Sequence, residues 1–258
     1  MSSGLPLLAP DWRAPPGVRA LVTTRRGGVS AAPREELNLA AHVGDTAAAV
    51  AENRRRLRAA AALPDEPRWL HQVHGAAVAD LDAGAREHPV QADAAVTGRA
   101  GTVCAVLTAD CLPVLLAAGD GSAVAIAHAG WRGLAAGVLE ATVAALRTRI
   151  AAGVALACWI GPAISARHFE VRADVREPFL AADAENAAAF VPGRAGHWQC
   201  DLPWLARRQL QRLGVAHIAD SGRCTYAEEA HFYSHRRDVQ HRGLAGTGRF
   251  ATLIWLQP

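Results

Sequence analysis

Short apolar runs of strand length, each ended by polar or small residues, constrain the fold of this chain most strongly. Such runs occupy residues 102–107, 123–128 and 155–160, and another at 114–118 follows an interruption after the first. Runs of this length and composition are typical of buried strands. Between residues 134 and 150, by contrast, apolar side chains recur every three or four positions, which predicts a helix with one apolar stripe. We therefore expect strands and helices packed together in layers.

The order of these elements favours an α+β (mixed α/β) fold, because strands and helices mix without a regular βα repeat. No internal repeat or low-complexity linker divides the chain, so we expect a single domain over residues 1–258. In a helix predicted at 46–62, the segment 53–56 should face solvent. Further strands are expected at 18–24, 69–80 and 250–256, and a further helix at 202–213, with Asp201 as its N-cap and Gly214 as its C-cap.

Composition excludes several kinds of chemistry. The chain has no lysine, and all 27 basic residues are arginine. Schiff-base, pyridoxal-phosphate, Walker-type and kinase-type lysine mechanisms are therefore ruled out. The formal charge is only +3, with acids interspersed among the arginines, so nucleic acid is not expected as a partner. Arginine still suits bidentate binding of a small anion.

The sequence also predicts a cytoplasmic protein that does not bind or cross a membrane. No apolar run approaches the length of a membrane span. The segment Met1–Pro16 lacks the apolar stretch of a signal peptide. Five scattered cysteines without a CxxC pair do not form a disulfide framework, which is consistent with a reducing compartment.

Three side chains able to bind a metal lie at predicted strand ends or breaks: His74, Cys111 and His128. Catalytic zinc takes three protein ligands of this kind and keeps a fourth position open. Taken alone, each residue is better explained as a buried structural side chain. Cys111 as a nucleophile with His128 as its base is a metal-free alternative. A blue-copper site is disfavoured, because the chain has no His-x-His pair and its single methionine is Met1.

Eight short motifs occur in order along the chain: TRRGGVS (24–30), LNL (37–39), NR (53–54), QVHG (72–75), TADCLP (108–113), HAGWRG (128–133), GP (161–162) and FYSHRR (232–237). In combination, they resemble the YfiH family of laccase-domain proteins, once called polyphenol oxidases. The resemblance runs from about residue 18 to the end of the sequence. His235 departs from it, since an aromatic residue is expected before the paired arginines.

The resemblance implies a layered sandwich of mixed β-sheets flanked by helices, related to the cytotoxic necrotizing factor fold. It implies a zinc ion on His74, Cys111 and His128, with copper able to replace it in vitro. The implied activity is phosphorolysis of adenosine, inosine, guanosine and methylthioadenosine, with hydrolytic deamination of adenosine. Nucleoside and phosphate would then be the small-molecule partners, and we expect a monomer.

Other functions remain open at this stage. Some members of the family are described as peptidoglycan editors, so an amidase acting on a muramyl-L-serine precursor is the alternative. A non-catalytic protein with a structural metal is another, and a fourth protein ligand would favour it. A copper polyphenol oxidase is the least favoured.

Phosphorolysis requires a group that holds phosphate, and arginine is suited to that role. Arg25, beside the Gly27–Gly28 turn, is the first candidate, with Arg236 and Arg237 as alternatives. Asn38 and Asp110 are expected to orient substrate or ligands, although Asp110 equally suits a turn cap.

Overall fold

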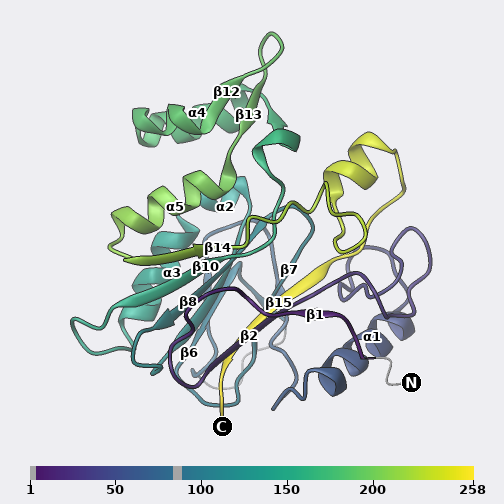
Figure 1. The fold of residues 1–258 in the computed structure, drawn as a ribbon, viewed down its shortest axis with the longest axis vertical. Helices are drawn as coiled ribbons and strands as arrows, with labels where there is room; N and C mark the ends of the chain where they lie inside the picture. The colour runs from purple at the N-terminus through teal and green to yellow at the C-terminus, as the bar shows by residue number, and fades with distance from the viewer. Residues whose placement is uncertain (1–3, 84–88) are drawn as a thin grey trace.

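The structure, a computed structural model, describes residues 4–83 and 89–258 and shows a layered α+β sandwich (Figure 1). The predicted fold class is therefore confirmed. Residues 1–3 and 84–88 lie outside the described part. The predicted single domain (1–258) and the segment Met1–Pro16 both include residues 1–3, so these two expectations fall partly outside the described residues.

The larger sheet has six strands in the order β14-β10-β8-β9-β6-β4. Its central pairs are antiparallel, whereas the outer pairs β10–β14 and β4–β6 are parallel. The strands are β4 (Val78–Asp80), β6 (Ala94–Thr97), β8 (Leu112–Ala118), β9 (Val124–Ala129), β10 (Leu156–Ile160) and β14 (His217–Asp220).

The second sheet has four antiparallel strands in the order β1-β2-β15-β7. Its strands are β1 (Leu7–Leu8), β2 (Val18–Thr23), β7 (Cys104–Thr108) and β15 (Phe250–Leu256). Two small sheets complete the strands: β3 (Leu70–His71) with β5 (Val90–Gln91), and β11 (Glu170–Val171), β12 (Phe190–Pro192) and β13 (Trp198–Cys200).

Alternating side chains divide the core into layers, because successive strand residues point to opposite faces. On β8, Leu112, Val114 and Leu116 pack towards the helices, while Leu115 and Ala117 pack against the four-stranded sheet. The outer face of that sheet is covered by α1 and the segment before it. The helices are α1 (Ala47–Ala60), α2 (Trp131–Ala135), α3 (Val138–Arg147), α4 (Ala173–Ala182) and α5 (Leu202–Arg212), with short turns η1 (Ala166–His168), η2 (Ala184–Ala189) and η3 (Arg236–His241).

Most expected elements are present. The strands predicted at 18–24, 123–128, 155–160 and 250–256 are β2, β9, β10 and β15. Helix α5 begins as expected, with the Asp201 carboxylate accepting a hydrogen bond from the backbone N–H of Trp204. The predicted C-cap was wrong by one residue: Leu213 is the C-cap, and Gly214 follows it with a φ of +72°.

Four further expectations were wrong in detail. The predicted strand 69–80 is interrupted by a turn at His74, so only its ends are strands. The run at 114–118 does not continue the strand at 102–107, because β7 and β8 belong to different sheets. The predicted helix 134–150 is split by Gly137, whose φ of +86° ends α2 before α3 begins. Asn53 is fully buried, because its amide bonds Ser30 and the backbone of Asn38.

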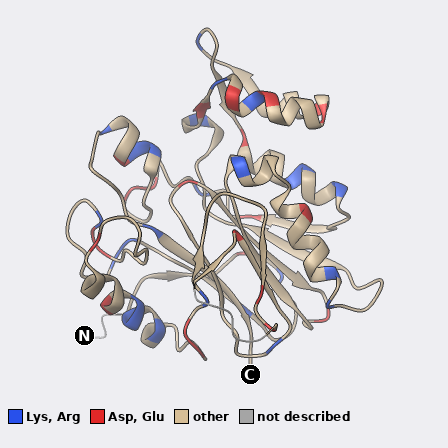
Figure 2. Ribbon diagram, turned by 180° about the vertical axis from the view of Figure 1, so that it is seen from behind, with Lys and Arg blue, Asp and Glu red and all other residues tan. Residues whose placement is uncertain are grey.

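Acidic and basic positions are mixed along the helices (Figure 2). Several form ion pairs, such as Glu52 with Arg55 and Arg56, and Asp183 with Arg208. No helix in the described ranges has both the length and the apolar character needed to span a membrane.

Candidate metal centre

His74 lies in a tight turn between β3 and β4. Its φ of 61° places it in the left-handed region, which is uncommon for residues other than glycine. The backbone N–H groups of Val73, His74 and Gly75 all donate to the Asp93 carboxylate, at 3.1, 2.9 and 2.7 Å. Three successive amides on one buried carboxylate stabilise this backbone and fix where the His74 ring projects.

Cys111 lies where the chain passes from the four-stranded sheet to the six-stranded one. The preceding residue, Asp110, has a φ of 96°. Its carboxylate accepts hydrogen bonds from the Thr225 hydroxyl and from the backbone N–H of Arg236, each at 2.7 Å. These two hydrogen bonds hold the connection between the sheets against the segment 225–236. Asp110 thereby positions Cys111, the next residue.

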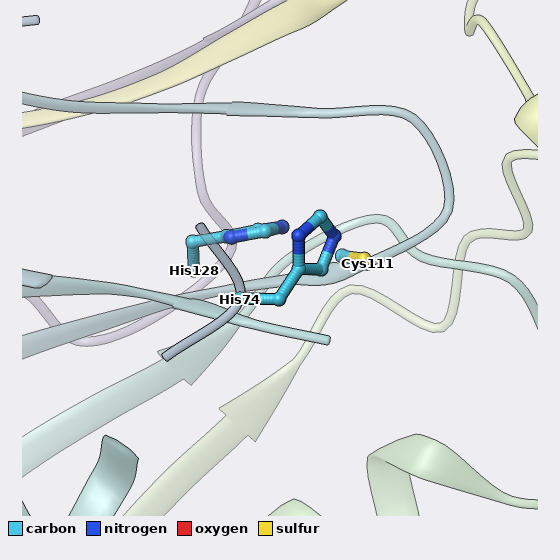
Figure 3. Close-up of side chains that lie close together, drawn as sticks. All are labelled: His74, Cys111 and His128. Carbon is cyan, nitrogen blue, oxygen red and sulfur yellow. The ribbon is translucent and has the colours of Figure 1, made fainter. Parts of the chain in front are cut away.

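His128 lies on β9, opposite Pro113 of β8. Its Nδ1 is 2.8 Å from Asp93 Oδ1, and both side chains are almost fully buried. A carboxylate is the acceptor here, so Nδ1 carries a proton and Nε2 is the ring nitrogen left for a metal ion. Figure 3 shows the side chains of His74, Cys111 and His128 converging, with the two imidazole centroids 4.8 Å apart.

These three residues fit a metal ion. Their potential ligand atoms lie within 4.8 Å of one another. Ligands around one tetrahedral zinc, at about 2.0–2.1 Å for nitrogen and 2.3 Å for sulfur, require a cluster of this kind. A side chain at Gly130 would obstruct it, because a Cβ there would lie 2.7 Å from Cys111 Sγ and 3.2 Å from His74 Cδ2. The absence of a side chain at Gly130 therefore keeps the space beside the thiol clear.

The electrostatics of the cluster favour a thiolate. Burial raises the pKa of the Cys111 thiol, but the charges and hydrogen bonds of His128 and His74 outweigh burial and bring it below the usual value. Burial lowers the pKa of His128, and its interactions with Cys111 and Asp93 more than reverse that shift. Thiolate is the form that binds metal ions, so the site is prepared for one.

A cavity of about 350 Å³ adjoins the cluster, and His74, Cys111 and His128 are among its lining residues. Of the five side chains predicted to contact substrate, Asp110 and Arg236 line it. Arg236 donates to the backbone carbonyl of Glu170 at 2.8 Å and lies over the ring of Phe169.

The other three predicted substrate-binding residues make internal contacts instead. Arg25 donates to the backbone carbonyls of Glu35 and Glu229. Asn38 is fully buried and bonds Asp45 and the backbone of Ala40. Arg237 pairs with Asp238 and donates to the carbonyls of Thr225, Tyr226 and Phe232. Of the three arginines predicted to hold phosphate, Arg236 lines the cavity, whereas Arg25 and Arg237 do not.

Comparison with known proteins gives one consistent result. A family model described as multi-copper polyphenol oxidoreductase laccase matches residues 19–257. A purine nucleoside phosphorylase of Pseudomonas aeruginosa is 50% identical over 251 residues, covering 97% of this chain and 98% of that one. The purine nucleoside phosphorylase YfiH of Escherichia coli K12 is 48% identical over 250 residues, with coverage of 97% and 98%.

The chain belongs to the YfiH family of laccase-domain proteins. A crystal structure of a Neisseria meningitidis protein agrees in fold, with a TM-score of 0.86 at 42% identity, covering 98% of this chain and 99% of that one. The resemblance drawn from the short motifs is therefore confirmed.

Three residues of this YfiH-family site were missed by the sequence interpretation. Asp93 is the one acid within the apolar run 92–96 and is fully buried. A buried acid requires a partner, so an acid inside an apolar run could have indicated a functional position. Arg249 lines the cavity but directly precedes the last predicted strand, where an arginine has no distinguishing pattern. His42, which also lines the cavity, lies in a segment without regular structure and carried no signal.

Proposed function

We propose that this protein is a zinc-dependent purine nucleoside enzyme. It would carry out phosphorolysis of adenosine, inosine, guanosine and methylthioadenosine, and hydrolytic deamination of adenosine. The observation that carries the proposal is the convergence of His74, Cys111 and His128 beside a cavity. The names of the relatives with 50% and 48% identity support the phosphorylase activity.

The number of ligands favours a catalytic metal over a structural one. Within the described residues, the cluster has three metal-capable side chains. Structural zinc sites are usually closed by four protein ligands, whereas catalytic sites use three. His74 is exposed, so the site is reachable from solvent. Among the residues that the structure describes, no fourth metal-capable side chain joins the cluster, which counts against the non-catalytic alternative.

The donor set favours zinc. Two imidazoles and one thiolate are ligands that suit zinc well. Asp93 holds His128 in the carboxylate–histidine arrangement common around such metals. When bound, zinc would supply Lewis-acid polarisation of water or of a substrate oxygen.

The cavity walls suit a nucleoside. Trp131 and Phe169 line it, and flat aromatic side chains provide apolar surface for a purine ring. Its volume of about 350 Å³ falls in the range typical of small-molecule sites. Burial lowers the pKa of both His42 and His235, which line the same cavity, so both imidazoles are mainly neutral at pH 7. Neutral imidazoles offer both a donor and an acceptor for hydrogen bonds with a base or a sugar.

The test is turnover of adenosine by protein with measured zinc content, with and without phosphate, followed by chromatography. Phosphate-dependent adenine and phosphate-independent inosine are the expected products. His74→Ala, Cys111→Ala and His128→Ala should each abolish both activities. His71→Ala is the matched control, because His71 is an exposed neighbouring histidine that does not line the cavity.

If fully zinc-loaded protein releases neither adenine nor inosine, the proposal is refuted. The muramyl-L-serine substrate would then be tested for release of L-serine. A ligand variant that retains full turnover would remove that residue from the site.

A further inference from the structure

Arg249 lines the cavity, and one edge of its guanidinium has no protein partner among the described residues. Its Nη1 donates to the backbone carbonyls of Thr247 and Gly248, at 3.1 and 3.0 Å. Across residues 4–83 and 89–258, no acceptor engages its Nε or Nη2, and no acid forms an ion pair with it. The Nε–Nη2 edge is a two-pronged donor that suits a phosphate or carboxylate.

The backbone of Arg249 is firmly held. Its N–H donates to Asn38 Oδ1 at 3.0 Å, and its carbonyl accepts from the N–H of Leu39 at 3.2 Å. Asn53 in turn donates to the Asn38 carbonyl at 2.8 Å. Two fully buried amide side chains thus anchor the backbone of Arg249, while the Nη1 bonds to Thr247 and Gly248 hold its guanidinium.

Thr108 supplies a second donor beside Arg249. It is the strand partner of Phe250, the residue after Arg249, and it lines the same cavity. Thr108 is 1% exposed, and its hydroxyl has no hydrogen-bond partner. A buried hydroxyl without a partner is unfavourable, so a ligand oxygen that accepts from it would stabilise the site.

The other two cavity-lining arginines each lie over an aromatic ring, whereas Arg249 lies over none in the described part of the chain. Arg236 uses Nη1 on the Glu170 carbonyl and lies over Phe169. Arg132 lies over Trp131 and is exposed. Arg249 combines an open donor edge, a fixed backbone and an adjacent unpartnered hydroxyl.

We propose that Arg249 and Thr108 form the phosphate subsite of the enzyme. The proposal rests on the proposed phosphorolysis. A phosphate oxygen forms a bond to C1′ of the ribose while the C1′–N9 bond breaks. The electron pair of that bond goes to N9, and the proton of HPO₄²⁻ ends on the purine. The products are ribose 1-phosphate and the free base. Arg249 holds the dianion in position for this displacement, and Thr108 donates to one of its oxygens.

The experiment separates this proposal from the proposed function by two readouts. The first is binding of inorganic phosphate to the zinc-loaded protein by calorimetry. The second is the phosphate dependence of adenine release, with KM for phosphate and for adenosine determined separately. Arg249→Gln should weaken phosphate binding and raise KM for phosphate by roughly 10- to 100-fold, the effect of losing charge-assisted hydrogen bonds. Its KM for adenosine should change far less, and Arg249→Lys should recover part of the loss.

Thr108→Val keeps the proposal testable if Arg249→Gln fails to fold. It removes a hydroxyl without a protein partner, so the melting temperature should not fall. KM for phosphate should still rise several-fold, by roughly the factor of one hydrogen bond. Arg58→Gln, on the exposed face of α1, is the matched control and should leave both readouts unchanged.

If the unaltered protein releases no base with phosphate, the proposed function fails. Calorimetry then decides the subsite by itself, and binding that does not depend on Arg249 overturns it. If base is released but Arg249→Gln keeps its phosphate KM, the subsite is wrong. A rise in phosphate KM in Arg236→Gln without one in Arg249→Gln would also overturn it.

Discussion

Asp93 and His128 form a buried pair in which the imidazole Nδ1 lies 2.8 Å from the carboxylate oxygen. The same carboxylate accepts the three amides of the His74 turn. Burial raises the pKa of Asp93, but the hydrogen bonds from His128 and from the backbone of Gly75 and Val73 bring it below its usual value. One ionised acid therefore orients both histidines of the metal cluster.

Asp93→Asn should lower zinc affinity by roughly 10- to 100-fold, the usual effect of losing the acid behind a histidine ligand. The amide cannot accept all the hydrogen bonds that the carboxylate accepts. Competition with a chromogenic chelator measures the change. Asp201→Asn is the control, because asparagine caps a helix as well as aspartate does. Unchanged affinity in Asp93→Asn would show that the histidines are oriented without it.

Gly130→Ala should remove metal binding while the fold is retained. The added Cβ would lie 2.7 Å from Cys111 Sγ, so the thiol must move out of the cluster. Zinc content after dialysis, compared with circular dichroism, separates the two effects. The control is Gly98→Ala, where the nearest neighbour of the added Cβ is 3.5 Å away. Full zinc content in Gly130→Ala would mean that the site accommodates the methyl group.

Cys111 should be the first cysteine that iodoacetamide alkylates in zinc-free protein at pH 7. Its lowered pKa keeps it as thiolate to lower pH than an ordinary thiol, and thiolate is the reactive form. Burial raises the pKa of Cys104, Cys158 and Cys200, which should remain unmodified. Zinc should protect Cys111, as peptide mass spectrometry would show. Equal alkylation with and without zinc would favour a metal-free thiol site.

Arg237→Gln should destabilise the protein strongly rather than alter substrate affinity. The side chains of Arg237 and Asp238 are each 4% exposed, so the substitution leaves a buried acid without its ion-pair partner. The expected loss is about 3–5 kcal/mol in the free energy of unfolding, from urea denaturation. Arg55→Gln, which breaks an exposed pair with Glu52, should cost less than about 1 kcal/mol. If the Arg237→Gln protein is as stable as the unaltered one but has a raised KM, Arg237 contacts the substrate and the structural role is wrong.

The sequence predicted the parts of this molecule that depend on local pattern. Apolar runs gave β9, β10 and β15, and the Asp201 cap marked the start of α5. The three metal-capable residues were identifiable because each stands in a distinctive short motif.

Features set by long-range contacts were not predictable. The turn at His74 depends on Asp93, 19 positions away, so the local alternation wrongly indicated a strand. The burial of Asn53 depends on partners at Ser30 and Asn38. Arg249 reaches the cavity because β15 pairs with β7. No local sequence pattern predicts that pairing.

The position of β15 between β2 and β7 also determines the order of events during synthesis. Residues 250–256 leave the ribosome long after the two strands that they join. Until then β2 and β7 have no shared neighbour, and the four-stranded sheet cannot close. His74, Cys111 and His128 all emerge in the first half of the 258 residues, more than a hundred positions before Arg249. A nascent chain therefore holds its metal-binding residues well before the wall of the cavity is in place, and its unpaired strand edges depend on late residues for protection from aggregation.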